Sequence, residues 1–144
     1  MKSILFGHGR THRILHSIDY TLSVFIDKDI TCHPDFAIDL VNQDFSSLSL
    51  NNFDEAVMVC CSNMVLLKGQ NLNIGFIRTV YESLKFGGKF YISNVYYRYP
   101  KYQNYNQERD KLVEDIESLR IFKYAGEQQR LDVQRGSMLV FVKI

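Results

Sequence analysis

The sequence has few of the residues that are typical of fibrous, disordered or disulfide-rich proteins. Among its 144 residues are two prolines, eight glycines and three cysteines, and tryptophan does not occur. With so little proline and glycine, and with 46% hydrophobic residues, the chain is neither fibrous nor disordered by composition. Its length suits a single hydrophobic core. We therefore expect one folded domain over residues 1–144.

Long apolar runs and a strong net charge are also lacking. No run approaches the roughly 20 residues of a membrane span, and the first residues lack the order of a signal peptide. A net charge of +1 gives no broad basic surface for nucleic acid. Cys32 and the adjacent Cys60 and Cys61 are odd in number and poorly spaced for a disulfide or zinc. The sequence predicts a cytoplasmic protein without a membrane segment and with buried, structural cysteines.

Strand and helix patterns alternate along the chain. Apolar runs predict strands over 3–6, 21–27, 55–61 and 89–95. Helical spacing predicts helices over 11–18, 72–84 and 106–121, the second ended by Gly87-Gly88. This alternation predicts an α/β Rossmann-like three-layer sandwich with a mostly parallel twisted sheet.

Two details of this pattern are specific. The last helix turns Leu112, Val113, Ile116 and Leu119 inward, and its outward face is charged: Glu108, Asp110, Lys111, Glu114 and Glu117. The stretch "RLDVQRGSMLVFVKI", residues 130–144, predicts two strands about a turn near Arg135-Gly136. We expect these strands to form an antiparallel hairpin at the edge of the sheet.

The first strand runs into a glycine turn, "ILFGHGRT". Gly7 and Gly9 let the backbone approach a ligand, and Asp27 ends the next strand, where it can accept hydrogen bonds from ribose hydroxyls. A dinucleotide motif would need glycine at position 12, where His12 stands. The pattern therefore favours a nucleoside cofactor without pyrophosphate over an NAD-type Rossmann enzyme.

At these residues the sequence resembles the class I S-adenosylmethionine-dependent methyltransferases, whose first motif reads roughly acid-x-G-x-G-x-G. Further motifs are similar over nearly the whole chain: "FIDKDITCHPDFAIDL", "NNFDEAVMVCCSNMVLL", "ESLKFGGKFYISNV" and the terminal hairpin. The resemblance implies that S-adenosylmethionine is the cofactor.

The resemblance also implies roles for particular residues. Gly7, His8 and Gly9 would line the methionine side of the cofactor, Asp27 would hold the ribose, and Lys28 would flank the adenine. Either Asp39 or Asp44 would lie near the adenine amine. The residues that end the fourth strand would lie beside the transferable methyl group and the substrate: Cys61, Ser62 and Asn63.

The first motif departs from the family at two positions. Leu5 replaces the residue that contacts the cofactor's amino group, and Thr11 replaces the third glycine. There is no Asn/Asp-Pro-Pro-Tyr-type motif. Because the first predicted strand begins at residue 3, we expect an open crevice without the N-terminal helices that often cover the substrate in this family. Two functions stay open: methyl transfer to an unidentified substrate, or a catalytically inactive methyltransferase-fold module that acts through partner binding.

The tyrosine-rich stretch "NVYYRYPKYQNY", residues 94–105, follows the last parallel strand, where open α/β sheets place binding residues. Its rings and cations could stack on nucleic-acid bases, dock a protein partner, or pack on their own sheet: Tyr96, Tyr97, Arg98, Tyr99 and Lys101. His8, His12 and His16 are spaced by four but have no third ligand at a suitable spacing. The sequence therefore predicts no metal site.

Overall fold

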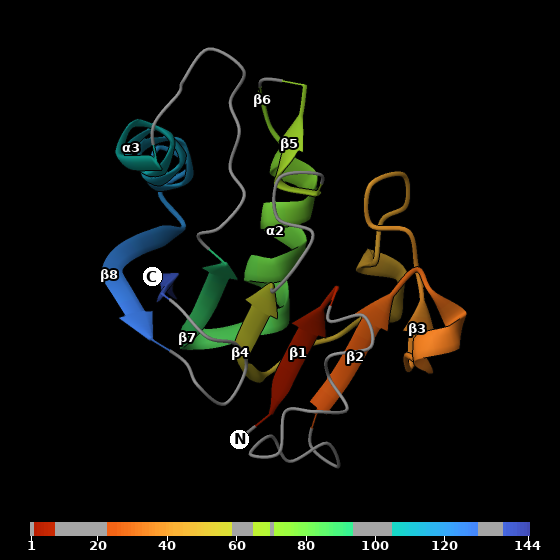
Figure 1. The fold of residues 1–144 in the computed structure, drawn as a ribbon. Coiled ribbons are helices and arrows are strands. Elements are labelled where there is room, and N and C mark those ends of the chain that lie inside the picture. Colours follow the sequence, from red (N-terminus) through yellow and green to blue (C-terminus); the bar gives the residue numbers. More distant parts are fainter. Residues whose placement is uncertain (1, 8–22, 59–64, 70, 94–104, 130–136) are drawn as a thin grey trace.

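The computed structural model describes residues 2–7, 23–58, 65–69, 71–93, 105–129 and 137–144. In this part of the chain seven strands form one sheet, in the order β3-β2-β1-β4-β7-β9-β8 (Figure 1). Their bounds are β1 Ser3–Phe6, β2 Ser23–Asp27, β3 Phe36–Ala37, β4 Phe53–Met58, β7 Leu84–Ser93, β8 Phe122–Gln129 and β9 Ser137–Lys143. The first five strands in this order are parallel, and β9 and β8 are antiparallel to their neighbours.

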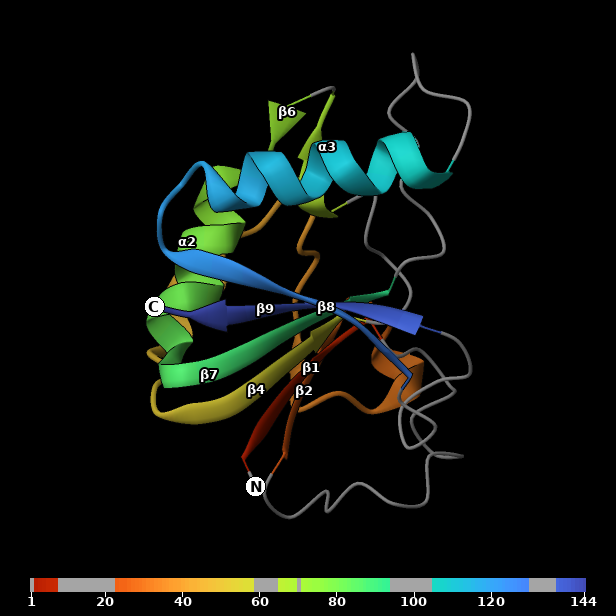
Figure 2. The same cartoon turned by 90° about the vertical axis from the view of Figure 1, so that its left-hand side faces the viewer.

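Helices and a short two-stranded ribbon complete the described fold. They are the helices α2 (Ile74–Ser83) and α3 (Tyr105–Glu117), the 3₁₀ helices η3 (Ile30–Cys32) and η4 (Ser46–Leu48), and a ribbon of β5 (Leu67–Lys68) with β6 (Asn71–Leu72). Figure 2 shows α2 and α3 on the same side of the sheet. Neither helix has the length and apolar character to cross a bilayer.

Both faces of the sheet are buried, as a three-layer sandwich requires. Successive side chains of a strand point to opposite faces, so Ile4 and Phe6 join the larger core beneath α2 and α3. Leu5 joins the smaller core on the other face, with Phe25 of β2 and Val57 of β4. The unbroken apolar runs in the sequence arise from this burial on both faces. The structure confirms the predicted α/β Rossmann-like class.

The end of α2 differs from the sequence prediction. The helix stops at Ser83, and β7 begins at once with Leu84. Gly87 and Gly88 therefore do not end the helix. They lie in a bulge of β7, because Phe53 pairs with Leu84 while Glu55 pairs with Lys89. A bulge needs residues outside the normal ladder, and glycine suits the positive φ of 75° found at Gly87.

The carbonyls at the end of α2 are satisfied from the last strand. Lys143 of β9 donates hydrogen bonds from Nζ to the carbonyl oxygens of Tyr81, at 2.8 Å, and Leu84, at 2.7 Å. Its ammonium also lies 4.1 Å from the centre of the Tyr81 ring. Burial lowers the pKa of Lys143, yet the cation still complements the negative end of the helix dipole.

Replacing Gly88 by alanine is expected to destabilise this bulge. An added Cβ would lie 2.7 Å from the carbonyl oxygen of Lys85 and 3.3 Å from that of Asp54, which are both backbone atoms. We expect a loss of about 1–3 kcal/mol in the free energy of unfolding, measured with urea. At Gly87 an added Cβ meets nothing within 4 Å, so Gly87→Ala should cost only the left-handed strain of about 1–2 kcal/mol. Equal stability of Gly88→Ala and the unaltered protein would contradict the close contact.

One residue predicted to face solvent on the last helix is buried. Glu108 is only 9% exposed because it lies four and eight residues before Leu112 and Ile116, on the same inward stripe. Its place in the first turn of α3 suits a carboxylate, since the helix dipole is positive there. The other charged residues of the predicted outward face are exposed or half-buried. The sequence prediction for Glu108 was wrong.

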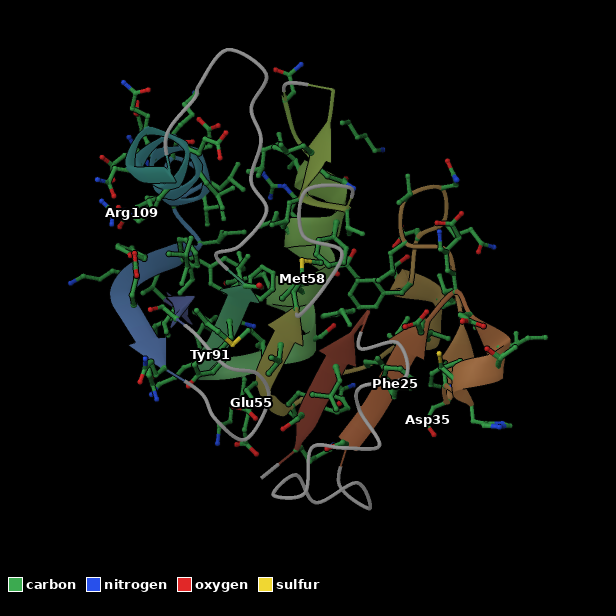
Figure 3. All side chains as sticks on the ribbon, in the orientation of Figure 1. Phe25, Asp35, Glu55, Met58, Tyr91 and Arg109 are labelled. Carbon is green, nitrogen blue, oxygen red and sulfur yellow. The ribbon has the colours of Figure 1, made fainter. Side chains whose placement is uncertain are left out.

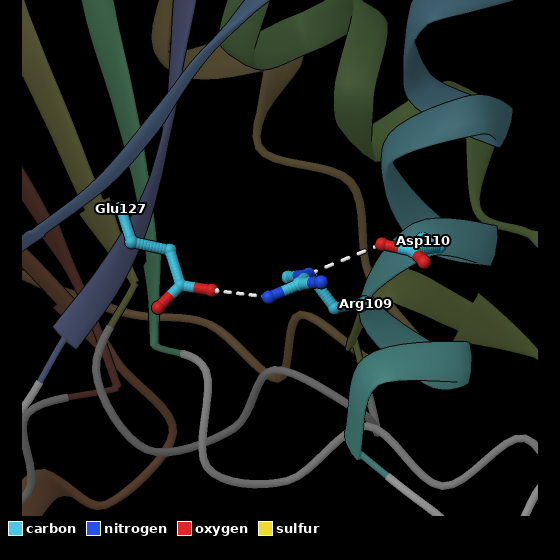
Figure 4. Close-up of polar contacts among 3 residues, drawn as sticks. All are labelled: Arg109, Asp110 and Glu127. Atoms are coloured by element: carbon cyan, nitrogen blue, oxygen red, sulfur yellow. Dashed lines mark hydrogen bonds and ion pairs between the residues drawn. The ribbon is translucent and has the colours of Figure 1, made fainter.

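An ion pair connects α3 to the edge of the sheet. Arg109 donates from its guanidinium to Glu127 of β8 and to the neighbouring Asp110, both at 3.1 Å (Figure 4). These carboxylates raise the pKa of Arg109 above its ordinary value. The pair lies on a half-exposed surface, so its contribution to stability is small.

The C-terminal hairpin is present, but its first strand lies earlier than predicted. Residues 137–143 form β9 as expected, whereas its partner is β8 at 122–129. Residues 130–136, predicted to hold the first strand and the turn, lie outside the described part. β9 lies between β7 and β8, so β8 is the strand at the edge of the sheet.

Candidate functional site

The carboxyl ends of β1, β2 and β3 meet at a pocket of about 180 Å³, which we call the β1–β3 pocket. In the sheet, β2 and β3 lie on one side of β1 and β4 lies on the other, so the strand order reverses at β1. Open α/β sheets bind ligands at such switch points, and the pocket lies beside this one. Its described lining combines one glycine, two carboxylates, one amine and apolar side chains: Gly7, Ile26, Asp27, Lys28, Ile38, Asp39, Leu40, Val41 and Val65.

Gly7 lines the β1–β3 pocket directly after the end of β1. Its φ is 66°, in the left-handed region that glycine adopts without strain. Its N–H donates to the carbonyl oxygen of Ile26 at 3.0 Å, which ties the start of the turn to β2. The predicted continuation of the turn, His8 and Gly9, lies outside the described residues.

Asp27 ends β2 at the wall of the β1–β3 pocket and is only 8% exposed. Its Oδ1 accepts the backbone N–H of Asp29 at 2.9 Å, which sets the direction of the carboxylate. Its carbonyl oxygen accepts the N–H of Ile38 at 3.1 Å and so holds the segment after β3 beside it. A buried carboxylate at the end of a strand is an acceptor with a defined position, as the ribose role predicted from the sequence needs.

The loop between β2 and β3 is closed by Asp35, a residue that the sequence reasoning did not single out. Its carboxylate Oδ2 accepts the N–H of Phe25 at 2.8 Å, and its own N–H donates to the carbonyl oxygen of Phe25 at 2.9 Å (Figure 3). These two bonds return the chain to the sheet just before β3. The Pro34-Asp35 pair in the sequence could have indicated this turn, because proline favours a turn and aspartate accepts hydrogen bonds from nearby backbone N–H groups.

The structure separates the two candidate adenine acids. Asp39 follows β3 and lines the β1–β3 pocket together with Asp27. Asp44 lies instead on a second pocket of about 190 Å³ at the start of α2, which we call the α2 pocket. There its Oδ1 accepts the N–H of Ser46 at 2.8 Å, and this bond is the main cause of its lowered pKa.

The two pockets are neighbours, because Leu40 and Val41 line both of them. Beneath the α2 pocket lies an aromatic cluster in which the Phe6 ring packs edge-on against Phe45 and Phe76, each at 5.3 Å between ring centres. This packing holds the segment 40–45 against α2. The position of both pockets therefore depends on the larger core.

Leu5 cannot supply a polar contact to a ligand. Its side chain is fully buried in the smaller core, so the position where the family usually has an acidic or polar residue is part of the hydrophobic interior here.

Asp54 is remote from the pocket, because it lies at the amino end of β4. There it accepts the N–H of Lys2 at 2.7 Å and pairs with Lys85, and Lys85 lowers its pKa.

Several predicted site residues lie outside the described part of the chain: Cys61, Ser62, Asn63, Tyr96, Tyr97, Arg98, Tyr99 and Lys101. Among the described residues no group of His, Cys, Asp and Glu side chains could hold a metal ion. Cys32 is buried, as predicted, and its Sγ lies 3.5 Å from Asp29. Burial is the main cause of the raised pKa of this thiol.

No protein-family model matches the chain, and no curated protein matches its sequence. Solved structures do match its fold. N-methyltransferase NodS from Bradyrhizobium japonicum WM9 aligns with 99% of this chain and 85% of its own, with a TM-score of 0.61 and 11% identity. The 16S rRNA (adenine(1408)-N(1))-methyltransferase from Catenulisporales acidiphilia aligns with 99% of this chain and 84% of its own, with a TM-score of 0.60 and 11% identity.

A putative methyltransferase from Streptococcus mutans, solved in complex with SAH, aligns with all of this chain (100%) and 89% of its own, with a TM-score of 0.55 and 12% identity. At such identities the likeness concerns the fold alone. The strand order, the antiparallel hairpin at one edge and these matches agree. The protein therefore has the Rossmann-like fold of the class I S-adenosylmethionine-dependent methyltransferases.

Proposed function

We propose that the protein binds S-adenosylmethionine in the β1–β3 pocket. The observation that carries the proposal is the meeting of Gly7, the buried Asp27 and Asp39 in one pocket with apolar walls. A nucleoside needs this combination, because its sugar carries hydroxyl donors and its base has flat apolar faces with a polar rim.

The pocket offers a separate partner for each part of adenosine. The carboxylate of Asp27 can accept from both ribose hydroxyls, which is a charge-assisted and therefore strong arrangement. Ile38, Leu40 and Val65 offer apolar surface to the base. Asp39 can accept from the adenine amine, and it is favoured over Asp44 because Asp44 lines the α2 pocket.

When bound, S-adenosylmethionine supplies an electrophilic methyl group on its sulfonium. The part of this chain would be to hold that group in line with an acceptor and away from water, since proximity and orientation are the main requirements of such a displacement. Gly7 marks the side of the pocket where the methionine portion would lie. The roles of His8, Gly9, Cys61, Ser62 and Asn63 beside it stay predictions.

One observation favours the second candidate, a catalytically inactive module of this fold that acts through partner binding. Leu5 is buried in the smaller core, so no carboxylate reaches the cofactor's amino group from that position. A missing charge-assisted hydrogen bond corresponds to about 1.5–3 kcal/mol, or roughly ten- to a hundredfold in affinity. We therefore expect the protein to bind the cofactor weakly.

Calorimetric titration of the purified chain tests both candidates. We expect saturable binding of S-adenosylmethionine and of its demethylated product SAH at dissociation constants below about 1 mM, and no binding of NAD. Absence of binding by both sulfur compounds at that concentration would overturn the proposal and leave the partner-binding module. Tight binding of NAD instead would assign the pocket to a dinucleotide.

A further inference from the structure

We propose that Asn42 and Gln43 are positioning residues that hold Asp39 as a preformed hydrogen-bond acceptor for the bound nucleoside. The inference rests on the proposed cofactor binding and names the residues that prepare the site for it. It comes from a closed set of hydrogen bonds in the turn 39–43, which follows β3.

Every polar group of Asp39 is engaged within this turn. Its Oδ2 accepts from the side-chain amide of Asn42 at 2.9 Å, and its Oδ1 accepts the N–H of Val41 at 3.1 Å. Its own N–H donates to Oε1 of Gln43 at 2.8 Å. Its carbonyl oxygen accepts the N–H groups of Asn42, at 3.1 Å, and Gln43, at 2.7 Å. The position of the carboxylate is therefore set by its own segment of the chain.

The two amide residues and the acid lie on different pockets. Asp39 lines the β1–β3 pocket, whereas the described lining of that pocket includes neither Asn42 nor Gln43. Both of them line the α2 pocket instead. Both amide side chains bond to Asp39, which lines the β1–β3 pocket, so they act on a ligand there as positioning residues rather than by direct contact.

The side-chain amide of Asn42 also favours the ionised form of Asp39, which is the form that accepts hydrogen bonds from a ligand. Its hydrogen bond is the largest cause of the lowered pKa of Asp39, with further contributions from the N–H of Val41 and the charge of Lys28. An ionised carboxylate has about four acceptor positions, and the turn occupies one on each oxygen. An acceptor that is already ordered and ionised loses less conformational entropy when the ligand binds.

The test compares Asn42→Ala and Gln43→Ala with Asn51→Ala, a control at an exposed asparagine that precedes β4 and lines neither pocket. Affinity for SAH is measured by calorimetry from neutral to acidic pH. In the ligand-free proteins, the pKa of Asp39 is measured by NMR of its carboxyl carbon. Thermal unfolding of each variant shows that the fold is kept.

We expect Asn42→Ala to weaken SAH binding about three- to tenfold at neutral pH. Without the amide the pKa of Asp39 rises toward its ordinary value, so binding is lost at a higher pH on acidification than in the unaltered protein. We expect Gln43→Ala to weaken binding less and to leave the pKa of Asp39 nearly unchanged, since Gln43 touches the backbone of Asp39. The control should match the unaltered protein.

The outcomes separate this inference from the proposed function. If the unaltered protein fails to bind SAH, both are overturned. If it binds, but Asn42→Ala keeps the same affinity and pH profile, the inference is overturned and the proposed function stands. A weaker affinity of Asn42→Ala without any change in the pH profile or in the pKa of Asp39 would show a structural role only, and it would also overturn the inference.

Discussion

Replacing Asp27 by asparagine is expected to weaken the binding of SAH about 10- to 100-fold. Asp27 is only 8% exposed and lines the β1–β3 pocket, so water replaces a lost ligand contact poorly. Hydrogen bonds to a charged group contribute about 1.5–3 kcal/mol each, and every 1.4 kcal/mol is tenfold in affinity. Asparagine keeps the shape of the side chain and an oxygen for the N–H of Asp29, which the Asp27 Oδ1 accepts at 2.9 Å. The loss of SAH affinity therefore measures the contribution of the negative charge and of one carboxylate oxygen of Asp27.

The matched control for this experiment is Asp44→Asn. Asp44 is the second acid that the motifs allowed, but it lies on the α2 pocket with its Oδ1 bound to the N–H of Ser46. We expect its substitution to change the affinity less than about twofold. Calorimetry of both variants decides the assignment. Loss of binding in Asp44→Asn together with normal binding in Asp27→Asn would show that the ligand occupies the other pocket.

Replacing Phe90 by alanine is expected to lower the free energy of unfolding by about 3–5 kcal/mol, the cost of a large cavity in a well-packed core. Phe90 is fully buried in the middle of β7. Its ring centre lies 5.9 Å from that of Phe122 and 6.4 Å from that of Phe76, so it connects β8 to the aromatic cluster beneath the α2 pocket. Such a loss is a large part of the total stability of one domain.

Phe86 offers a control of the same residue type on the same strand. It is 78% exposed in the bulge, so Phe86→Ala removes little buried surface. Its ring centre lies 5.0 Å from the Lys143 ammonium, so we expect a loss of at most about 1 kcal/mol, measured by urea denaturation beside Phe90→Ala. Similar stability losses in the two variants would contradict the described packing of β7.

Much of the architecture could be predicted from the sequence. The apolar runs that became β2 and β4, and the helical spacing that became α2 and α3, are local patterns that burial enforces. The place of Asp27 at the end of its strand follows from the same pattern, because the apolar run that predicts the strand stops at this residue. Boundaries were less predictable, as the β7 bulge and the early β8 show, because strand pairing sets them.

The sequence by itself determined the strands β1, β2 and β4, the helices α2 and α3, the glycine after β1 and the acid that ends β2, since each depends on neighbours along the chain. Only the tertiary structure placed Asp39 and Asp44 on different pockets, because both acids fit the motif and their positions depend on how the segment after β3 packs against the sheet and α2. It also placed Leu5 in the interior and Glu108 on the buried stripe of α3. These outcomes depend on which residues pack together in the tertiary structure, and a local sequence pattern does not specify such contacts.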